Sequence, residues 1–269
     1  MVGTLSQLVT LVSYGNAYLR GREIGSLSSN SEFQFCNTVE FLFPKPAGPW
    51  FGKELLVGSP LKWLETLKDR KCTRLKLSHF PTPNPEAPDH MLAAFVGGGG
   101  QSLIEAAFDS NSDYWAGKWE VTNQKAPDRK IWRVTYNVVA KNSKSTSNAA
   151  IDLQGLRNRL EKTLLEIRDF AQKHKVDNFA AIFQNGIDCL NSASVTEKSY
   201  HKDLVPDGWY SLEAEQLLTA ASNAWVFGGM GSWNDLGFEG ADNKIYEDLS
   251  AKLYSTINES IVAAVNSKH

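Results

Sequence analysis

The stretch Lys141-Asn142-Ser143-Lys144-Ser145-Thr146-Ser147-Asn148-Ala149 divides the chain into two parts with different hydrophobic patterns. It contains no large apolar residue, so it predicts a linker or a long loop. Before it, apolar residues mostly alternate with polar ones, as in strands. After it, they recur every three or four residues, as in helices. Strands followed by helices favour an α+β fold.

Residues 1–140 are expected to form an N-terminal helix and a largely antiparallel sheet of five or six strands. The helix is predicted over 4–21 with Thr4 as its cap, and a short helix over 60–70. The first strand is predicted over 33–43. Short connections separate the later strands, which favours an antiparallel meander. These later strands are expected at 73–77, 91–96, 103–108, 114–122 and 131–139.

Residues 150–269 are expected to form about four helices packed on or beside the sheet. The clearest helical spacing covers 151–176, where leucines and other apolar residues recur every three or four positions. We expect both parts of the chain to form a single α+β unit. Whether 141–149 instead separates two domains is left open. The other helices are predicted at 179–190, 211–227 and 242–266, with Ser211 as a cap.

The composition restricts the class of protein. The chain has 269 residues, of which 42% are hydrophobic and 22% charged, and its formal net charge is −2. Such a chain has no excess of positive charge for nucleic-acid phosphates. No apolar run is long enough for a membrane span, and no signal peptide stands at the start. We therefore expect a soluble, cytoplasmic protein that binds neither nucleic acid nor membrane.

Cysteine and histidine spacing predicts no metal site and no cofactor. Cys36, Cys72 and Cys189 lie far apart without a CxxC pair, so we expect unpaired, buried thiols. The histidines lack the close spacing of zinc ligands. His79 and His90 flank a proline-rich loop, and we expect both to be solvated.

The run Gly97-Gly98-Gly99-Gly100 has two interpretations. A flexible hairpin connection between two strands is favoured, because the residues after it alternate as a strand does. A phosphate-binding turn is the alternative, but the run lacks the lysine and the spacing of known phosphate loops.

The stretch 224–235 contains the first group of candidate site residues. Gly228 is expected to end the preceding helix in a left-handed conformation. Trp233, Asn234 and Asp235 are predicted to bind a ligand or partner at the floor of a pocket. The structural alternative is that Asn234 or Asp235 caps a short turn while Trp233 attaches the loop to the core.

The loop 201–210 contains the second group. Asp203 and Asp207 are candidate ligand or partner contacts, with Trp209 beside them. Two acids in one cleft also suit general acid–base chemistry. Loops rich in Asp, Pro and Gly form simply because these residues turn well, so a structural role is the alternative.

These observations favour a non-catalytic binding protein whose target is a protein partner or a small ligand. Bacterial immunity or toxin-neutralising proteins are one class with these properties. The alternative is a hydrolase that uses carboxylates of the loops 201–210 and 234–239. Ser232 lacks the complete GxSxG pattern of a serine hydrolase. The identity of the target and the oligomeric state stay open.

Overall fold

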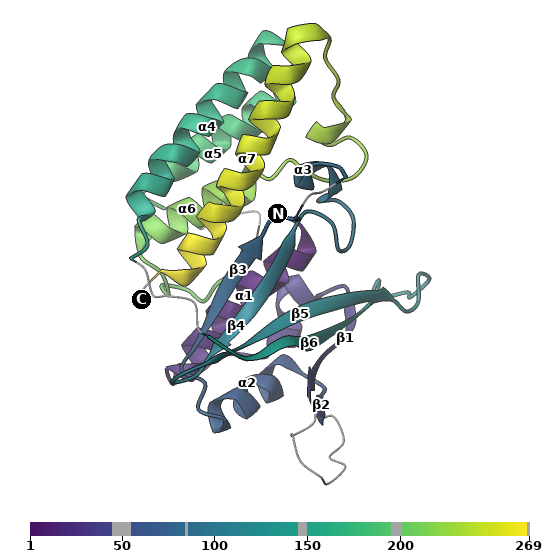
Figure 1. The fold of residues 1–269 in the computed structure, drawn as a ribbon, viewed down its shortest axis with the longest axis vertical. Coiled ribbons are helices and arrows are strands. Elements are labelled where there is room, and N and C mark those ends of the chain that lie inside the picture. Colours follow the sequence, from purple (N-terminus) through teal and green to yellow (C-terminus); the bar gives the residue numbers. More distant parts are fainter. Residues whose placement is uncertain (45–54, 84–85, 145–149, 195–200, 268–269) are drawn as a thin grey trace.

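The computed structural model describes residues 1–44, 55–83, 86–144, 150–194 and 201–267. It has an α+β fold in which a six-stranded sheet lies beside a group of long helices (Figure 1). The elements in chain order are α1 (Gly3–Leu19), η1 (Leu27–Ser29), η2 (Ser31–Phe33), β1 (Cys36–Phe43), β2 (Leu55–Val57), α2 (Pro60–Asp69), β3 (Arg74–Phe80), α3 (Asp89–Leu92), β4 (Gln101–Ala107), β5 (Ser112–Val121), β6 (Trp132–Ser143), α4 (Leu153–Lys173), α5 (Asp177–Leu190), α6 (Leu212–Asn223), η4 (Trp233–Asp235) and α7 (Gly240–Asn266).

The sheet has the strand order β2-β1-β6-β5-β4-β3. Every neighbouring pair is antiparallel except β1 and β6, which run parallel with Phe41 opposite Tyr136. The expected α+β fold with a largely antiparallel sheet is confirmed. The strands β3, β4, β5 and β6 form the expected antiparallel meander, and β1 then joins β6 in parallel. Parallel neighbours need a long connection, and here the chain from β2 to β5 provides it.

One face of the sheet forms an aromatic core with α1 and α2. Phe41 of β1 stacks on Trp63 of α2 and on Tyr136 of β6, with centroid distances of 4.4 and 5.0 Å. Trp115 of β5 meets Phe41 edge-on at 6.2 Å. The Tyr136 hydroxyl donates to Gln7 Oε1 on α1 at 2.8 Å. These contacts fasten the N-terminal helix to the middle of the sheet.

The helices α4 to α7 enclose a second core around η4. The rings of Phe179 and Phe183 on α5 each meet Trp233 edge-on at 5.2 Å, and Tyr246 of α7 contacts it at 5.4 Å. The Trp233 indole N–H donates to Ser250 Oγ at 2.8 Å. The expected helical spacing is confirmed, because most of the repeating apolar residues are buried here, although Ile245 near the start of α7 is 44% exposed.

One predicted strand is absent from the structure, and one strand of the structure was not predicted. Residues 91–96 do not form a strand, because Asp89–Leu92 is a helical turn and turns follow it. Ala93 is buried, but Met91, Phe95 and Val96 are exposed, the last two at 68% and 54%, so the alternation there marks no sheet face. The strand Leu55–Val57 was not predicted, because three residues are too few for a pattern.

The predicted helix caps have mixed outcomes. Helix α1 begins at Gly3 with Val2 in the cap position, so the cap prediction for Thr4 is wrong. Val2 has no side-chain oxygen to offer the first turn. The prediction for Ser211 is confirmed, since its side chain accepts from the backbone N–H of Ala214 at 3.3 Å.

Helix α6 ends earlier than expected. It stops at Asn223, and Trp225 then packs its ring on Tyr254 of α7 at 5.5 Å instead of extending the helix. Gly228 is therefore not a left-handed helix stop, and the positive φ of this loop, +85°, belongs to Gly231. The loop 224–235 is shaped by packing against α7.

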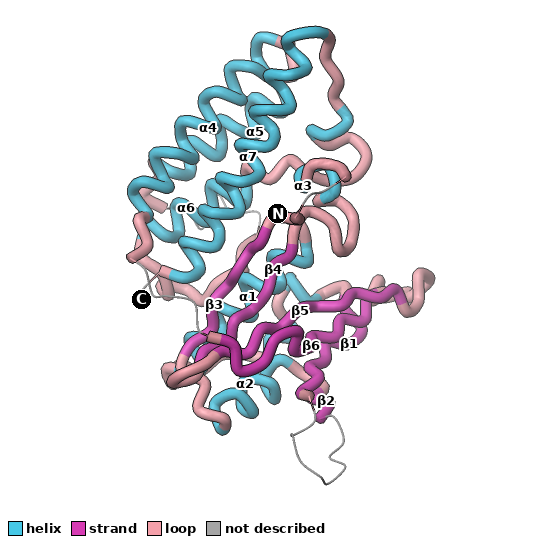
Figure 2. The backbone as a smooth tube through the Cα atoms, viewed as in Figure 1, coloured by secondary structure: helices cyan, strands magenta, loops and turns pink. Residues whose placement is uncertain are grey.

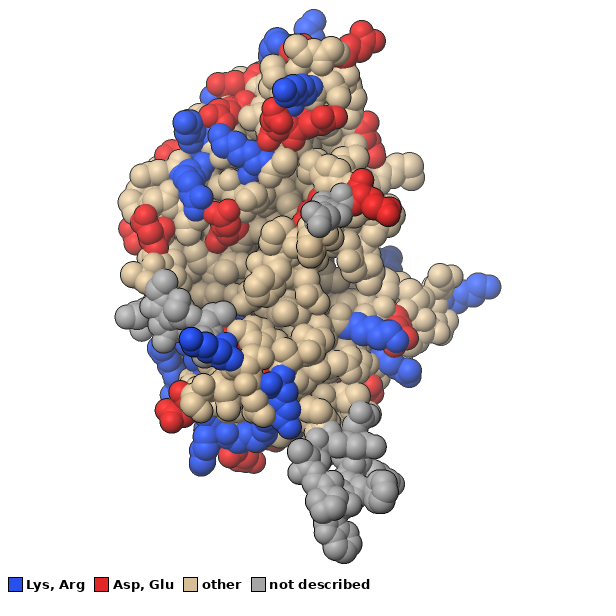
Figure 3. Space-filling model, in the orientation of Figure 1, with Lys and Arg blue, Asp and Glu red and all other residues tan. Residues whose placement is uncertain are grey.

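Helix α7 connects the two parts of the chain, since it packs against β3 as well as against α4 and α6. Residues 141–143 belong to β6, while 145–149 of the predicted linker lie outside the described residues. On the face seen in Figure 3, charged side chains gather over the long helices and over the part of the sheet farthest from these helices. The surface between the two groups is largely uncharged.

Two further predictions concern single properties. Cys36, Cys72 and Cys189 are free and buried, as expected. Among the described residues, no helix has the length and apolar character needed to cross a membrane.

Candidate functional site

The strands β4 and β5 pair over only part of their length. Ile104–Ala107 pair with Ser112–Trp115, although β4 begins at Gln101 and β5 continues along β6 to Val121. The first residues of β4, Gln101–Leu103, pair only with β3, and β5 diverges from β4 after Trp115 (Figure 2). The sheet therefore contains a fork between β4 and β5.

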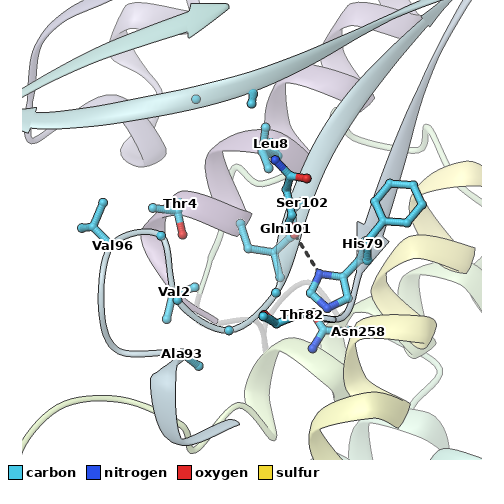
Figure 4. A pocket seen from close by; sticks show the side chains of 18 of the residues that line it. Val2, Thr4, Leu8, His79, Thr82, Ala93, Val96, Gln101, Ser102 and Asn258 are labelled. Carbon is cyan, nitrogen blue, oxygen red and sulfur yellow. Dashed lines mark hydrogen bonds between the residues drawn. The ribbon is translucent and has the colours of Figure 1, made fainter. Parts of the chain in front are cut away.

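A cavity of about 600 Å³, the fork cavity, lies in this opening next to the N-terminal end of α1. Gln101 and Ser102 of β4 line one side of it, and residues 116–119 of β5 line another. The run 97–100 and the segment 79–83 contribute further walls. Figure 4 shows side chains from α1, β3, β4 and α7 around this space. The volume lies within the ordinary range of small-ligand sites.

Much of the fork cavity is apolar and aromatic. Rings of Trp119, Tyr136, Trp225 and Tyr254 line it, together with aliphatic side chains of α1. Two of these rings are held by hydrogen bonds: the Trp225 indole donates to the carbonyl of Phe227 at 2.7 Å, and the Tyr254 hydroxyl donates to a glycine carbonyl of the 97–100 run at 2.5 Å. Such walls suit a flat or branched apolar group.

The glycine run has a conformation that other residues rarely adopt. Gly97, Gly99 and Gly100 have φ values of +86°, +80° and +85°. A Cβ atom at Gly99 would lie 2.6 Å from the Tyr254 hydroxyl oxygen, and one at Gly100 would lie 2.8 Å from the carbonyl oxygen of Phe80. Both the backbone angles and the lack of space therefore require glycine. The run joins α3 to β4, so it is neither the expected hairpin nor a strand-to-helix phosphate turn.

Backbone donors of this run are available to a ligand. Within the described part of the chain, the N–H groups of Gly97, Gly99 and Gly100 have no hydrogen-bond acceptor, whereas Gly98 donates to the carbonyl of Phe95 at 3.0 Å. Gly99 is buried. Buried backbone N–H groups nearly always have an acceptor, so the N–H of Gly99 is a donor with unused hydrogen-bonding capacity.

His79 and Ser102 form the polar pair of the cavity. They are opposite each other on β3 and β4, and His79 Nδ1 lies 3.0 Å from Ser102 Oγ (Figure 4). The imidazole lies against Gly100, since a Cβ there would be 2.9 Å from its Cε1 atom. Among the described residues, Nε2 has no hydrogen-bond partner. It is thus the nitrogen left for a ligand.

Burial lowers the pKa of His79, and the nearby carboxylate of Asp89 opposes this only in part. The ordinary pKa of histidine is about 6.5, so His79 is neutral at pH 7 in the unliganded protein. Among the described residues that line the fork cavity, Lys118 is the only one with a full charge, and no Asp or Glu is present. The lining therefore offers hydrogen-bond donors, and the carboxylate that acts on His79, Asp89, is not part of it.

The predicted residues of the stretch 224–235 lie away from this cavity. Trp233 is fully buried in the helical core. The amide of Asn234 donates to the backbone carbonyl of His90 at 2.8 Å, which ties the loop to α3. Asp235 is exposed, and its carboxylate accepts from the backbone N–H of Gly231. The cap of η4 is Ser232, not Asn234 or Asp235.

The predicted residues of the loop 201–210 attach it to the N-terminal part of the chain. The Asp203 carboxylate accepts from the backbone N–H of Ser31 at 2.7 Å and from its hydroxyl. Asp207 is exposed, and its side chain makes no recorded contact within the described residues. The guanidinium of Arg20 lies over the Trp209 ring at 5.6 Å. The carboxylates of Asp203 and Asp235 contact different elements, and no described contact brings them together.

Sequence reasoning missed the residues that line the fork cavity most distinctively, His79, Ser102, Trp119 and Tyr254. One local signal was present: the four-glycine run is followed two residues later by a serine. The partners of that serine are not visible locally, since His79 is 23 positions away. In the described chain, no three His, Cys, Asp or Glu residues gather at metal-binding distances.

Comparison with known proteins adds no further evidence: neither a protein-family model, nor a curated protein, nor a solved structure matches this chain.

Proposed function

We propose that the protein binds a small molecule and that the fork cavity is its binding site. The observation that carries the proposal is a cavity of about 600 Å³ that is lined by aromatic rings and by the 97–100 run, in which three N–H groups have no acceptor among the described residues. Small-ligand sites combine these features: mainly apolar walls, which supply affinity, and a few donors, which orient the ligand.

The proposal develops the small-ligand half of the expectation drawn from the sequence. A protein partner would use a surface, whereas the fork cavity is a recess between a sheet and two helices. The hydrolase alternative required carboxylates from two loops in one cleft. Asp203 is engaged with Ser31, and Asp235 with its own loop at Gly231, so these acids do not support a shared active site.

Two neighbouring residues allow a matched test. Val96 lines the fork cavity and is 54% exposed, so Val96→Trp is expected to fill the entrance without disturbing the core. Phe95, 68% exposed, is not among the residues that line the cavity, and Phe95→Trp is the control. Both substitutions add an exposed indole, and only one of them adds it to the cavity.

The experiment is a screen of neutral aromatic fragments, including indole, followed by amide chemical shifts in NMR spectra. Binding should shift the amides of Gly99 and Gly100 and the indole N–H of Trp119. These shifts should appear in the wild type and in Phe95→Trp and be lost in Val96→Trp. The proposal fails if no fragment shifts these signals, or if Val96→Trp responds as the wild type does.

A further inference from the structure

We infer that the glycine end of the fork cavity is a carboxylate subsite, so that the ligand is a small organic acid with an apolar body. The inference rests on the proposed function, because it names the class of ligand for the same cavity. The subsite consists of the free N–H groups of Gly97, Gly99 and Gly100 together with His79 and Ser102.

The backbone supplies the first reason. In a turn or bend, successive backbone N–H groups can form a concave arrangement that binds anions. Gly99 and Gly100 are consecutive residues of the bend before β4, with φ values of +80° and +85°. Gly99 is buried and the Tyr254 hydroxyl is bound to its carbonyl, so the loop is held in this conformation before any ligand arrives. Preformed donors reduce the entropy lost on binding.

His79 supplies the second reason. Its ring lies against Gly100, and Ser102 occupies its Nδ1 atom. When the Ser102 hydroxyl donates to Nδ1, the proton of the neutral ring is on Nε2, which then acts as a donor. The imidazole and the glycine N–H groups can thus donate to the same oxygen group.

The charges decide between a carboxylate and a phosphate. A phosphate carries close to two negative charges and is usually held by several cations. Among the described cavity residues only Lys118 is charged at pH 7, and its side chain is 66% exposed and paired with Glu120 at 2.9 Å. One cation that is already paired and a neutral imidazole match a single negative charge better than two. The aromatic walls match the apolar remainder of such an acid.

Binding of a carboxylate at this subsite should be coupled to protonation of His79. A bound carboxylate beside the imidazole favours the protonated ring, so binding should raise the pKa of His79 that burial has lowered. Binding of the acid should then tighten as the pH falls from about 8 to about 6, with proton uptake. The other ionisable groups around His79 are Asp89 and His90 at α3, Tyr254 and Glu259 on α7, and Lys118 on β5.

The test compares phenylacetate with phenylacetamide, which has nearly the same shape and no charge, by isothermal titration calorimetry. Phenylacetate should bind about tenfold more tightly at pH 7, because hydrogen bonds to a charged group are stronger than those to a neutral one. Its affinity should rise toward pH 6 and that of phenylacetamide should not. His79→Gln should lose this pH dependence. His90→Gln is the matched control, because His90 does not line the fork cavity.

Every other outcome overturns a specific part of the proposal. Equal affinities for the two probes overturn the carboxylate subsite and leave the binding cavity in place. The same holds if only the neutral probes, phenylacetamide or indole, bind. A preference for phenylacetate that is independent of pH, or unchanged in His79→Gln, overturns the role of His79. If no probe binds and no neutral fragment shifts the Gly99 amide, both the subsite and the proposed function fail.

Discussion

The side-chain amide of Asn16 makes both hydrogen bonds that a neighbouring strand would make to Leu75. Its Nδ2 atom donates to the Leu75 carbonyl at 2.9 Å, and its Oδ1 atom accepts from the Leu75 N–H at 2.8 Å. Asn266 of α7 repeats this arrangement at Leu77, with distances of 2.7 and 2.8 Å. Because β3 is an edge strand, two helices cover its backbone with side chains and keep it from pairing with another chain.

Replacing Asn16 by Ala should therefore destabilise the protein by about 2–4 kcal/mol, since two backbone groups lose their partners in a buried place. Asn16 is 4% exposed. Asn266→Ala should cost less, about 1–2 kcal/mol, because Asn266 is only half-buried and water can replace its amide. Urea denaturation measures both free energies of unfolding. A change below about 0.5 kcal/mol for Asn16→Ala would contradict the edge-covering role.

The η4 segment provides a second prediction. Trp233→Ala should cost about 3–5 kcal/mol, because it leaves a cavity among Phe179, Phe183 and Tyr246 and removes the hydrogen bond to Ser250. Asp235→Ala should cost less than about 1 kcal/mol, because the carboxylate is exposed. Thermal unfolding followed by circular dichroism separates the two. Similar losses for both variants would show that the loop, and not the tryptophan, supplies the stability.

Asp203 and Asp207 form a natural pair of variants. Asp203→Ala should cost about 1.5–3 kcal/mol, because its carboxylate accepts two hydrogen bonds from Ser31. Asp207→Ala should stay within about 0.5 kcal/mol of the wild type, because only its backbone carbonyl is bound, by Arg22. The comparison uses chemical denaturation at pH 7. A neutral effect of Asp203→Ala would return this residue to the candidates for ligand binding.

His79 and His90 contribute to the pH dependence of stability, as does the buried amine of Met1, whose pKa burial lowers to about 5. Burial is the main cause that lowers the pKa of each. The unfolded state then binds more protons than the folded state between the two pKa values, so stability present above about pH 6.5 is lost as the pH falls toward the folded-state pKa. His79→Gln and His90→Gln should each reduce the loss of stability between about pH 7.5 and about pH 5.5.

The check is a series of urea midpoints at these two pH values. The double variant should show the smallest difference between them. If the double variant loses as much stability as the wild type, the burial of the two imidazoles does not control the pH dependence. The buried amine of Met1, whose pKa burial lowers to about 5, is then the group to test.

The accuracy of the sequence predictions depends on how local each signal is. The helix over 151–176 was predictable because every apolar residue on its buried face lies three or four positions from the next. The helix α2 was predictable from Pro60 at its first turn and its repeating leucines. The segment 91–96 misled because a few alternating residues carry little information when no sheet face is present.

The candidate site was less predictable than the fold. Trp233, Asn234 and Asp235 stand together in the sequence, yet their contacts point to the helical core, to α3 and to their own loop. Glycine, asparagine and aspartate in one loop indicate a turn of the backbone. They do not show that the neighbouring side chains line the same cavity.

The sequence by itself determined the division into a strand-rich part and a helical part, the apolar faces of the long helices and the glycine-rich run, because each depends on spacing within a few residues. Only the tertiary structure decided the parallel pairing of β1 with β6, the divergence of β4 from β5 and the meeting of His79, Ser102 and Gly99 beside Tyr254. Gly99 and Tyr254 are 155 positions apart. Contacts at such separations depend on how whole elements pack, and no local pattern encodes them.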